Sequence, residues 1–274
     1  DVTITFNGAT NEFTVEDAGI AAITPGAGCV AVVGEPFRAT CTLAGATAIT
    51  VDLGDLDDGY IGTTLAVPTT VVGGTGDDGP VNTGSGNDTV TLGDGDDGAS
   101  TGLGNDAIDG GAGNDVTLNG GGGNDTITGG DGNDRILDGD GNDTVTSGAG
   151  EDQMLSGLGT DSLSGGADID FVSYSRANAV NVSLDGVAND GEAGEADNAQ
   201  ADIENLNGGS GNDTLTGNAS VNAINGGSGD DTIGGLGNAD ALVGAVANYT
   251  LSGGTGQDEL TGADGNDTLS GNEG

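Results

Sequence analysis

The chain has 274 residues, of which 59 are Gly, 45 are acidic and 3 are basic, and its formal net charge is −42. The basic residues are all Arg and there is no His, which excludes lysine Schiff-base chemistry, nucleophilic catalysis that depends on His, and zinc sites built with His. A surface so acidic repels phosphate backbones and anionic lipids, and the chain contains no run of 18 apolar residues. We therefore expect no nucleic-acid partner and no membrane insertion.

The first part of the chain differs in composition from the rest. The β-branched, alternating run at 2–6 is followed by Asn7-Gly8 and a second apolar run at 13–15, which predicts a β-hairpin. Further short strands are predicted at 29–33 and 47–53. Residues 1–53 are therefore expected to form a small N-terminal β cap.

Two features of the sequence bear on export from the cell. The chain begins at Asp1, and its only Met is Met154, which we interpret as the removal of a secretory signal peptide, although a fragment would look the same. Cys29 and Cys41 are the only cysteines. In an exported protein they are expected to form a disulfide.

A nine-residue period begins after the cap, with one residue inserted before 125. Each unit has Gly-rich positions one to five, an Asp at position six and, in most units, an apolar residue two positions later, as in residues 208–216. A fixed short period predicts a solenoid, because one unit can bury its apolar residue only against its neighbours. The position-six residues are Asp88, Asp97, Asp106, Asp115, Asp125, Asp134, Asp143, Asp152, Asp161, Asp170, Asp213, Asp231, Asp240, Asp258 and Asp267, with Asp78 as an irregular forerunner.

The glycine content excludes helices, since each Gly costs about 1 kcal/mol in a helix relative to Ala. Each unit is predicted to form a six-residue turn and a three-residue strand, such as 126–128, whose middle side chain points inward. Two units would form one coil. The period divides the chain into a first block at 54–173, distorted rungs with a loop at 174–207, and a second block at 208–274.

The position-six carboxylates are expected to stack along two edges of the solenoid. Carboxylates about 5 Å apart repel each other by about 3 kcal/mol at an effective dielectric constant near 20. Three Arg residues cannot compensate for so many contacts, so external cations are required. Carboxylate and carbonyl oxygens suit Ca²⁺, and we predict multiple Ca²⁺ ions as the cofactor.

The unit matches the nonapeptide G-G-x-G-x-D-x-U-x, and over 73–173 and 208–271 the chain resembles the RTX, or hemolysin-type calcium-binding, proteins. The resemblance implies an all-β, right-handed parallel β-roll or β-solenoid. It also implies that each Ca²⁺ lies between turns two units apart, held by position-six carboxylates, Asp78 included, and by backbone carbonyls at positions one and three. The carbonyls so implied belong to Gly110, Ala112, Gly120, Gly122, Gly129, Asp131, Asp138, Asp140, Ser147, Ala149, Ser156, Leu158, Gly165, Ala167, Gly208, Ser210, Gly226 and Ser228.

Several units depart from this pattern. Asn222 and Tyr249 replace the position-six Asp, so their sites are expected to be weak or absent. Pro80 and Ala99 stand where the inward apolar residue belongs, which predicts irregular first turns. The acidic residues of 190–198 would form either an extra ion site or a solvated loop, and the solvated loop is favoured.

The favoured function is a calcium-binding extracellular structural module in a surface layer, fibre or adhesive assembly, secreted or at the cell surface. The alternative is the calcium-dependent folding or secretion module of a secreted enzyme whose catalytic domain is absent. Catalysis by this chain itself is not expected, because a regular carboxylate ladder offers no asymmetric constellation with one raised pKa. Ice binding would need an outward row of Thr and Asx at one turn position, and position three has no such row. The sequence ends at 271–274 after a rung with no polar cap, and two explanations stay open: head-to-tail filaments, or a chain that is truncated or frays at its end.

Overall fold

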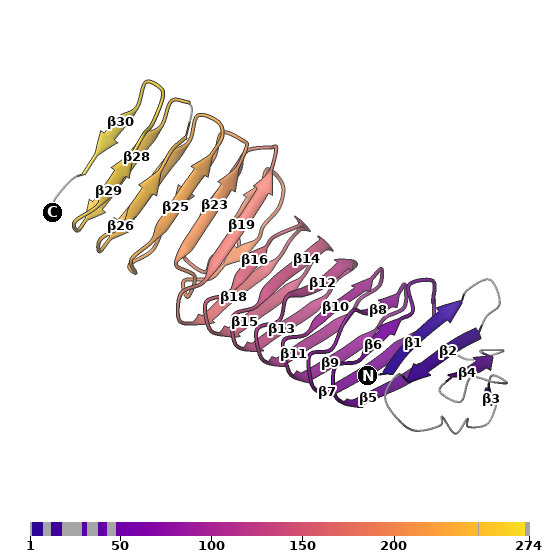
Figure 1. Cartoon of the computed structure of the whole chain (residues 1–274). Helices are drawn as coiled ribbons and strands as arrows, with labels where there is room; N and C mark the ends of the chain where they lie inside the picture. The colour runs from indigo at the N-terminus through magenta and orange to yellow at the C-terminus, as the bar shows by residue number, and fades with distance from the viewer. Residues whose placement is uncertain are drawn as a thin grey trace. The chain divides into compact units, whose positions relative to one another are not determined.

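The computed structural model describes residues 2–7, 12–17, 29–31, 38–42, 48–245 and 247–271. Within these ranges every secondary-structure element is a β-strand, and most strands stack in parallel as a β-solenoid (Figure 1). The expected all-β class is thus confirmed. The described residues include no helix long and apolar enough to span a bilayer. The chain divides into two compact units, residues 1–135 and 136–274.

The first unit opens with an antiparallel group of strands: β1 (Val2–Asn7), β2 (Glu12–Asp17), β3 (Cys29–Ala31) and β4 (Arg38–Thr42). The predicted hairpin is confirmed, since β1 pairs with β2, and β2 continues through β4 to β3. The backbone register sets Cys29 opposite Cys41. The side chains of both cysteines lie outside the described part of the chain, and the disulfide stays a prediction.

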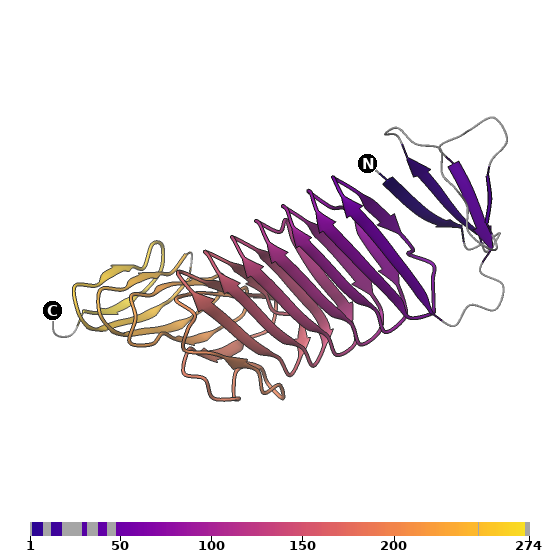
Figure 2. The same cartoon turned by 90° about the horizontal axis from the view of Figure 1, so that it is seen from below.

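The solenoid of the first unit consists of two parallel sheets, visible as stacked arrows in Figure 2. One contains β6 (Gly59–Ile61), β8 (Val81–Gly84), β10 (Gly98–Gly102) and β12 (Thr117–Gly122), and the other contains β5 (Ile49–Asp55), β7 (Thr69–Thr75), β9 (Thr89–Asp94), β11 (Ala107–Ala112) and β13 (Thr126–Asp131). Consecutive strands alternate between the sheets. Val90 pairs with Ile108 and Ile108 with Ile127, so two units make one coil, as expected.

The second unit has three sets of paired strands. The first contains β14 (Arg135–Gly141), β16 (Gln153–Leu155), β19 (Phe171–Arg176), β23 (Asn205–Gly209), β25 (Ala223–Gly227), β27 (Ala241–Val243) and β29 (Glu259–Thr261), with β17 (Leu158–Gly159) beside β14. The second contains β15 (Thr144–Ala149), β18 (Ser162–Ala167) and β22 (Asn198–Ala199). The third contains β21 (Gly191–Glu192), β20 (Val180–Ser183), β24 (Thr214–Thr216), β26 (Thr232–Gly237), β28 (Thr250–Thr255) and β30 (Thr268–Ser270).

The core is a stack of apolar side chains, one from most rungs and two from β5, β9, β19 and β20. Ile127 is 1% exposed between the outward Thr126 and Thr128, and the same alternation recurs along both units. Burying such a side chain stabilises the fold by roughly 1.5–3 kcal/mol relative to leaving it exposed. The expected inward position is therefore confirmed in most units, but in the last two Leu260 is half-buried and Leu269 is 48% exposed. After Asp78 and Asp115 the inward residue comes one place later, at Val81 and Leu118.

Many strands are longer than the predicted three residues, whereas β16, β24, β27, β29 and β30 have the predicted length. β13 has six, because positions one to three of the turn remain extended and pair with the same positions of the neighbouring coil. Gly130, at position two of its repeat, cannot be replaced without strain: its φ is +127°, and a Cβ there would lie 1.9 Å from the carbonyl oxygen of Gly111. The glycines therefore allow coils to approach closely without ending the strands.

Candidate metal sites

The position-six carboxylates are buried rather than solvated. Asp97 and Asp170 are 0% exposed and Asp115 is 1% exposed. Asp residues are rarely buried without a partner, because desolvating a carboxylate is costly. Only the last two, Asp258 and Asp267, are half-buried. The other buried position-six residues are Asp78, Asp88, Asp106, Asp125, Asp134, Asp143, Asp152, Asp161, Asp213, Asp231 and Asp240.

One oxygen of each carboxylate is held by the coil before it. The backbone N–H of Asp88 donates to Oδ1 of Asp106 at 2.7 Å, and the N–H of Asp213 donates to Oδ1 of Asp231 at 2.8 Å. The same bond recurs between other position-six residues that lie two repeats apart in one compact unit. It fixes the orientation of the side chain and stacks the Asp residues in columns.

The second oxygen, Oδ2, is left for another partner. It is buried and accepts no hydrogen bond in Asp78, Asp88, Asp97, Asp106, Asp115, Asp170, Asp213, Asp231 and Asp240. A buried acceptor without a partner costs about 1–3 kcal/mol, and more when it is charged. Repeated in this way along the ladder, the cost points to a cation.

The position-one glycines form a cradle beside this oxygen. A Cβ on Gly110 would lie 2.0 Å from Oδ2 of Asp115 and 2.5 Å from the carbonyl oxygen of Gly129, the position-one residue of the next coil. A Cβ on Gly235 would lie 2.2 Å from Oδ2 of Asp240. Each cradle thus converges carboxylate and carbonyl oxygens on one spot that a side chain would fill. Such a donor set fits Ca²⁺, which takes six to eight oxygen ligands.

Similar cradles adjoin Gly73 and Gly208, where a position-one carbonyl is also close, and the position-six carboxylate alone adjoins Gly165, Gly226, Gly253 and Gly262. The position-three carbonyls are differently engaged. Those of Ala112, Gly122, Asp131 and Ala167 accept backbone hydrogen bonds from position-four glycines of the preceding coil. A carbonyl has two lone pairs and can accept a second interaction. The position-one carbonyls thus face the cradles directly, while these position-three carbonyls also maintain the stack.

In some units a side chain occupies the cradle. Position one is Thr101 in one coil, and its hydroxyl donates to the carbonyl oxygen of Gly120 at 2.8 Å. The Ser147 hydroxyl donates to the carbonyl of Gly165 at 2.6 Å. These two carbonyls are among the predicted ligands, so the ladder contains glycine cradles and hydroxyl-filled units. Thr83, Leu92, Asp138 and Ser156 are the other position-one residues with side chains in the two blocks.

Burial perturbs the titration of the ladder. It raises the pKa of Asp115 to about 7, with a smaller upward contribution from the charges of Asp134 and Asp97. Burial likewise raises the pKa of Asp170 to about 7 and that of Asp231 to about 6. The fold without cations therefore disfavours the anionic carboxylates, and a bound cation would reverse that preference.

The two substituted units have their own partners. Oδ1 of Asn222 accepts the N–H of Asn218 at 2.8 Å, and its Nδ2 donates to the carbonyl of Glu204 at 2.9 Å. The Tyr249 ring lies beside Gly244, and its hydroxyl donates to the carbonyl of Gly227 at 2.7 Å. Neither side chain presents a carboxylate to a cation, which supports the expectation of weak or absent sites there.

The interruption at 174–207 continues the ladder, which sequence reasoning missed. The N–H of Asp161 donates to Oδ1 of Asp197 at 2.9 Å, and the N–H of Asp170 donates to Oε2 of Glu204 at 3.1 Å. Asp197 is 0% exposed and Asp190 is 1% exposed, so the favoured solvated loop was wrong. Asp197 follows Asp161 by 36 residues, a multiple of nine that could have identified it.

The loop is fixed by its own hydrogen bonds. Oδ1 of Asp190 accepts the N–H of Ser183 at 2.7 Å, and its Oδ2 accepts the N–H of Ala199 at 2.9 Å. Arg176 forms an ion pair with Glu195 and lies 5.4 Å from the ring centroid of Tyr174. These contacts hold Asp197 in line with the column.

Comparison with protein families identifies the repeat. The family model describes four copies of the RTX calcium-binding nonapeptide repeat. It matches five stretches of this chain, residues 82–116, 117–137, 137–172, 199–233 and 250–274, which together exceed half of its length. The chain belongs to this family. As a member of the RTX repeat family it is a calcium-binding β-roll module, in agreement with the buried Asp columns. The comparison with curated proteins gave no match.

Proposed function

We propose that the chain is an extracellular structural module whose β-roll folds and becomes rigid when Ca²⁺ fills the glycine cradles. The observation that carries the proposal is the recurring Oδ2 atom, buried without a hydrogen bond beside a position-one carbonyl. Because the ligands converge only in the coiled chain, cation binding and folding are the same equilibrium. The protein would serve in a surface layer, fibre or adhesive assembly.

Circular dichroism of the purified chain tests this coupling. In chelator at low salt we expect an unfolded spectrum, and a β spectrum should return at millimolar or lower Ca²⁺. Mg²⁺ at the same concentration is the control, since its short bonds and octahedral preference do not suit carbonyl cradles. A β-roll that persists in chelator at neutral pH would contradict the proposal, as would equal folding in Mg²⁺.

The extracellular location is supported by the family, whose repeats are typical of secreted proteins. We propose a non-catalytic role because the ladder repeats one carboxylate environment along its length. The alternative, a folding or secretion module of a secreted enzyme, predicts a catalytic domain in the same polypeptide. Mass spectrometry of the mature protein from its source distinguishes the two: a larger mass would favour the enzyme.

A further inference from the structure

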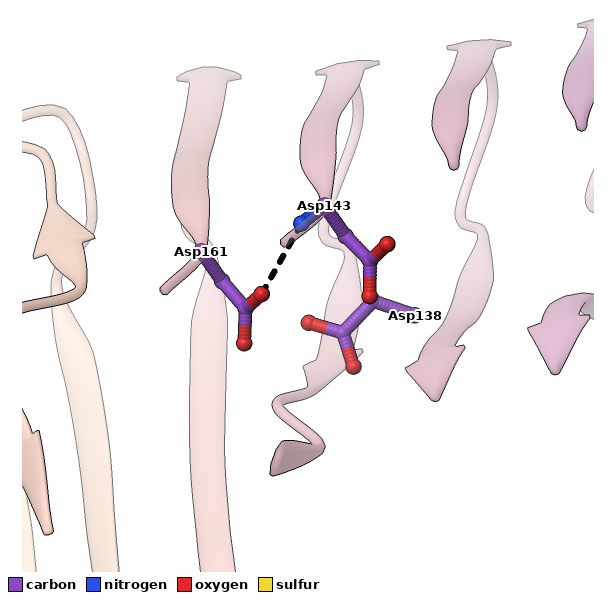
Figure 3. A group of neighbouring side chains, drawn as sticks. All are labelled: Asp138, Asp143 and Asp161. Atoms are coloured by element: carbon purple, nitrogen blue, oxygen red, sulfur yellow. Dashed lines mark hydrogen bonds between the residues drawn. The ribbon is translucent and has the colours of Figure 1, made fainter. Parts of the chain in front are cut away.

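Asp138 stands at position one of its repeat, where most repeats have Gly. Its carboxylate lies with those of Asp143 and Asp161, and one oxygen from each lies within 4.8 Å of the other two. All three residues are buried. Figure 3 shows Asp138 extending from β14 toward the two position-six side chains. The three carboxylates thus meet where other units have a glycine cradle.

The Asp138 side chain is oriented by the backbone. Its Oδ1 accepts the N–H of Gly157 at 2.6 Å and the N–H of Gly139 at 2.7 Å. Its Oδ2 is buried and has no hydrogen-bond partner. Two donors on Oδ1 restrict the orientation of the carboxylate and leave Oδ2 available to a further ligand.

A hydroxyl and a carboxylate in this position have opposite consequences. The Ser147 hydroxyl donates a hydrogen bond to a carbonyl and adds no charge. An anionic Asp138 instead adds a third negative charge to a buried cluster. Three buried carboxylates this close together repel one another when all are anionic. A cation resolves this conflict. Two oxygens that bind the same Ca²⁺ ion lie at most about 4.6–5.2 Å apart, and the oxygens of the cluster are within that limit.

We propose that Asp138, Asp143 and Asp161 form a three-carboxylate site that binds Ca²⁺ and binds trivalent hard cations more tightly than the glycine cradles do. The attraction of the additional carboxylate grows with the charge of the ion, so the third charge favours a trivalent ion over a divalent one. The proposal rests on the calcium binding proposed for the ladder, and it adds the Asp138 side chain as a ligand.

Europium luminescence under direct excitation tests the site in the full chain. Eu³⁺ is titrated into protein held folded in millimolar Ca²⁺, and we expect one Eu³⁺ ion to bind before any other. Asp138→Asn removes the charge at constant shape, and Asp138→Gly restores the cradle of neighbouring repeats. Both should weaken the first Eu³⁺ site at least tenfold. The control Asp109→Asn makes the same charge change at an exposed side chain of β11 that is no predicted ligand, and it should leave the first Eu³⁺ site unchanged.

The outcomes separate this proposal from the proposed function. Folding in Ca²⁺ with equal Eu³⁺ affinity in wild type and Asp138→Asn would overturn the three-carboxylate site alone. A wild-type chain that binds neither ion would overturn the proposed function. If the variants fail to fold, anomalous diffraction from wild-type crystals grown with Eu³⁺ decides. Europium bonded to Oδ2 of Asp138 supports the site, and its absence there refutes it.

Discussion

Closing one glycine cradle with a methyl group should remove one ion. The added Cβ of Gly235→Ala would lie 2.2 Å from Oδ2 of Asp240 and 2.8 Å from the carbonyl oxygen of Gly253, where the ion would bind. Gly234→Ala is a matched control on the same strand, since a Cβ there meets nothing within 4 Å. The two variants differ only in the face of β26 to which they add the methyl group.

The size of the effect follows from linkage. At a Ca²⁺ concentration 100 times the dissociation constant, one site contributes about 2.7 kcal/mol to the free energy of unfolding. Losing it should lower the Tm by roughly 5–10 °C for a unit of this size. The control should match or slightly exceed the wild type, because replacing Gly restricts the unfolded chain.

In saturating Ca²⁺, native mass spectrometry measures the number of bound ions and thermal unfolding measures the Tm. We expect Gly235→Ala to retain one Ca²⁺ fewer than Gly234→Ala and to melt earlier. A full complement of ions in Gly235→Ala, with the Tm of the control, would refute the assignment of the cradle as the binding site.

Other perturbations test the ladder and its ends. Burial raises the pKa of carboxyls such as Asp115, to about 7, so the fold without cations loses stability as the pH rises through those values. Lowering the pH from 8 to 5 in chelator should therefore restore the β circular dichroism spectrum. An unchanged spectrum would contradict this. Thr101→Gly should open a cradle and add one Ca²⁺ in native mass spectra. An unchanged number of ions would show that the Thr101 hydroxyl does not exclude the ion. Reduction of a Cys29–Cys41 disulfide should loosen the cap while most calcium sites stay filled, and loss of all calcium on reduction would show that the cap nucleates the roll. Head-to-tail association predicts filaments in light scattering and negative-stain images, against which a monodisperse monomer would count.

Sequence alone determined the regular part of this protein. The nine-residue period is a local property, and it defines which residues turn, which side chain points inward and where the Asp residues align. The parallel coil, the inward Ile127 and the columns through Asp115 and Asp231 could therefore be predicted before any coordinates. The same reasoning predicted the hairpin of β1 and β2 from alternation and a turn signal.

The tertiary structure decided what lies off the period. The length of the strands depends on pairing between coils, which three-residue runs do not reveal. Asp197 and Glu204 enter the ladder because the chain leaves the coil after β19 and returns to the stack, so their neighbours are 34 to 36 residues away in sequence. The Asp138 side chain is likewise defined by Gly157 and Asp161 of the next coil. A repeat encodes contacts at fixed separation, whereas these contacts depend on how the chain closes around an interruption or fills a cradle.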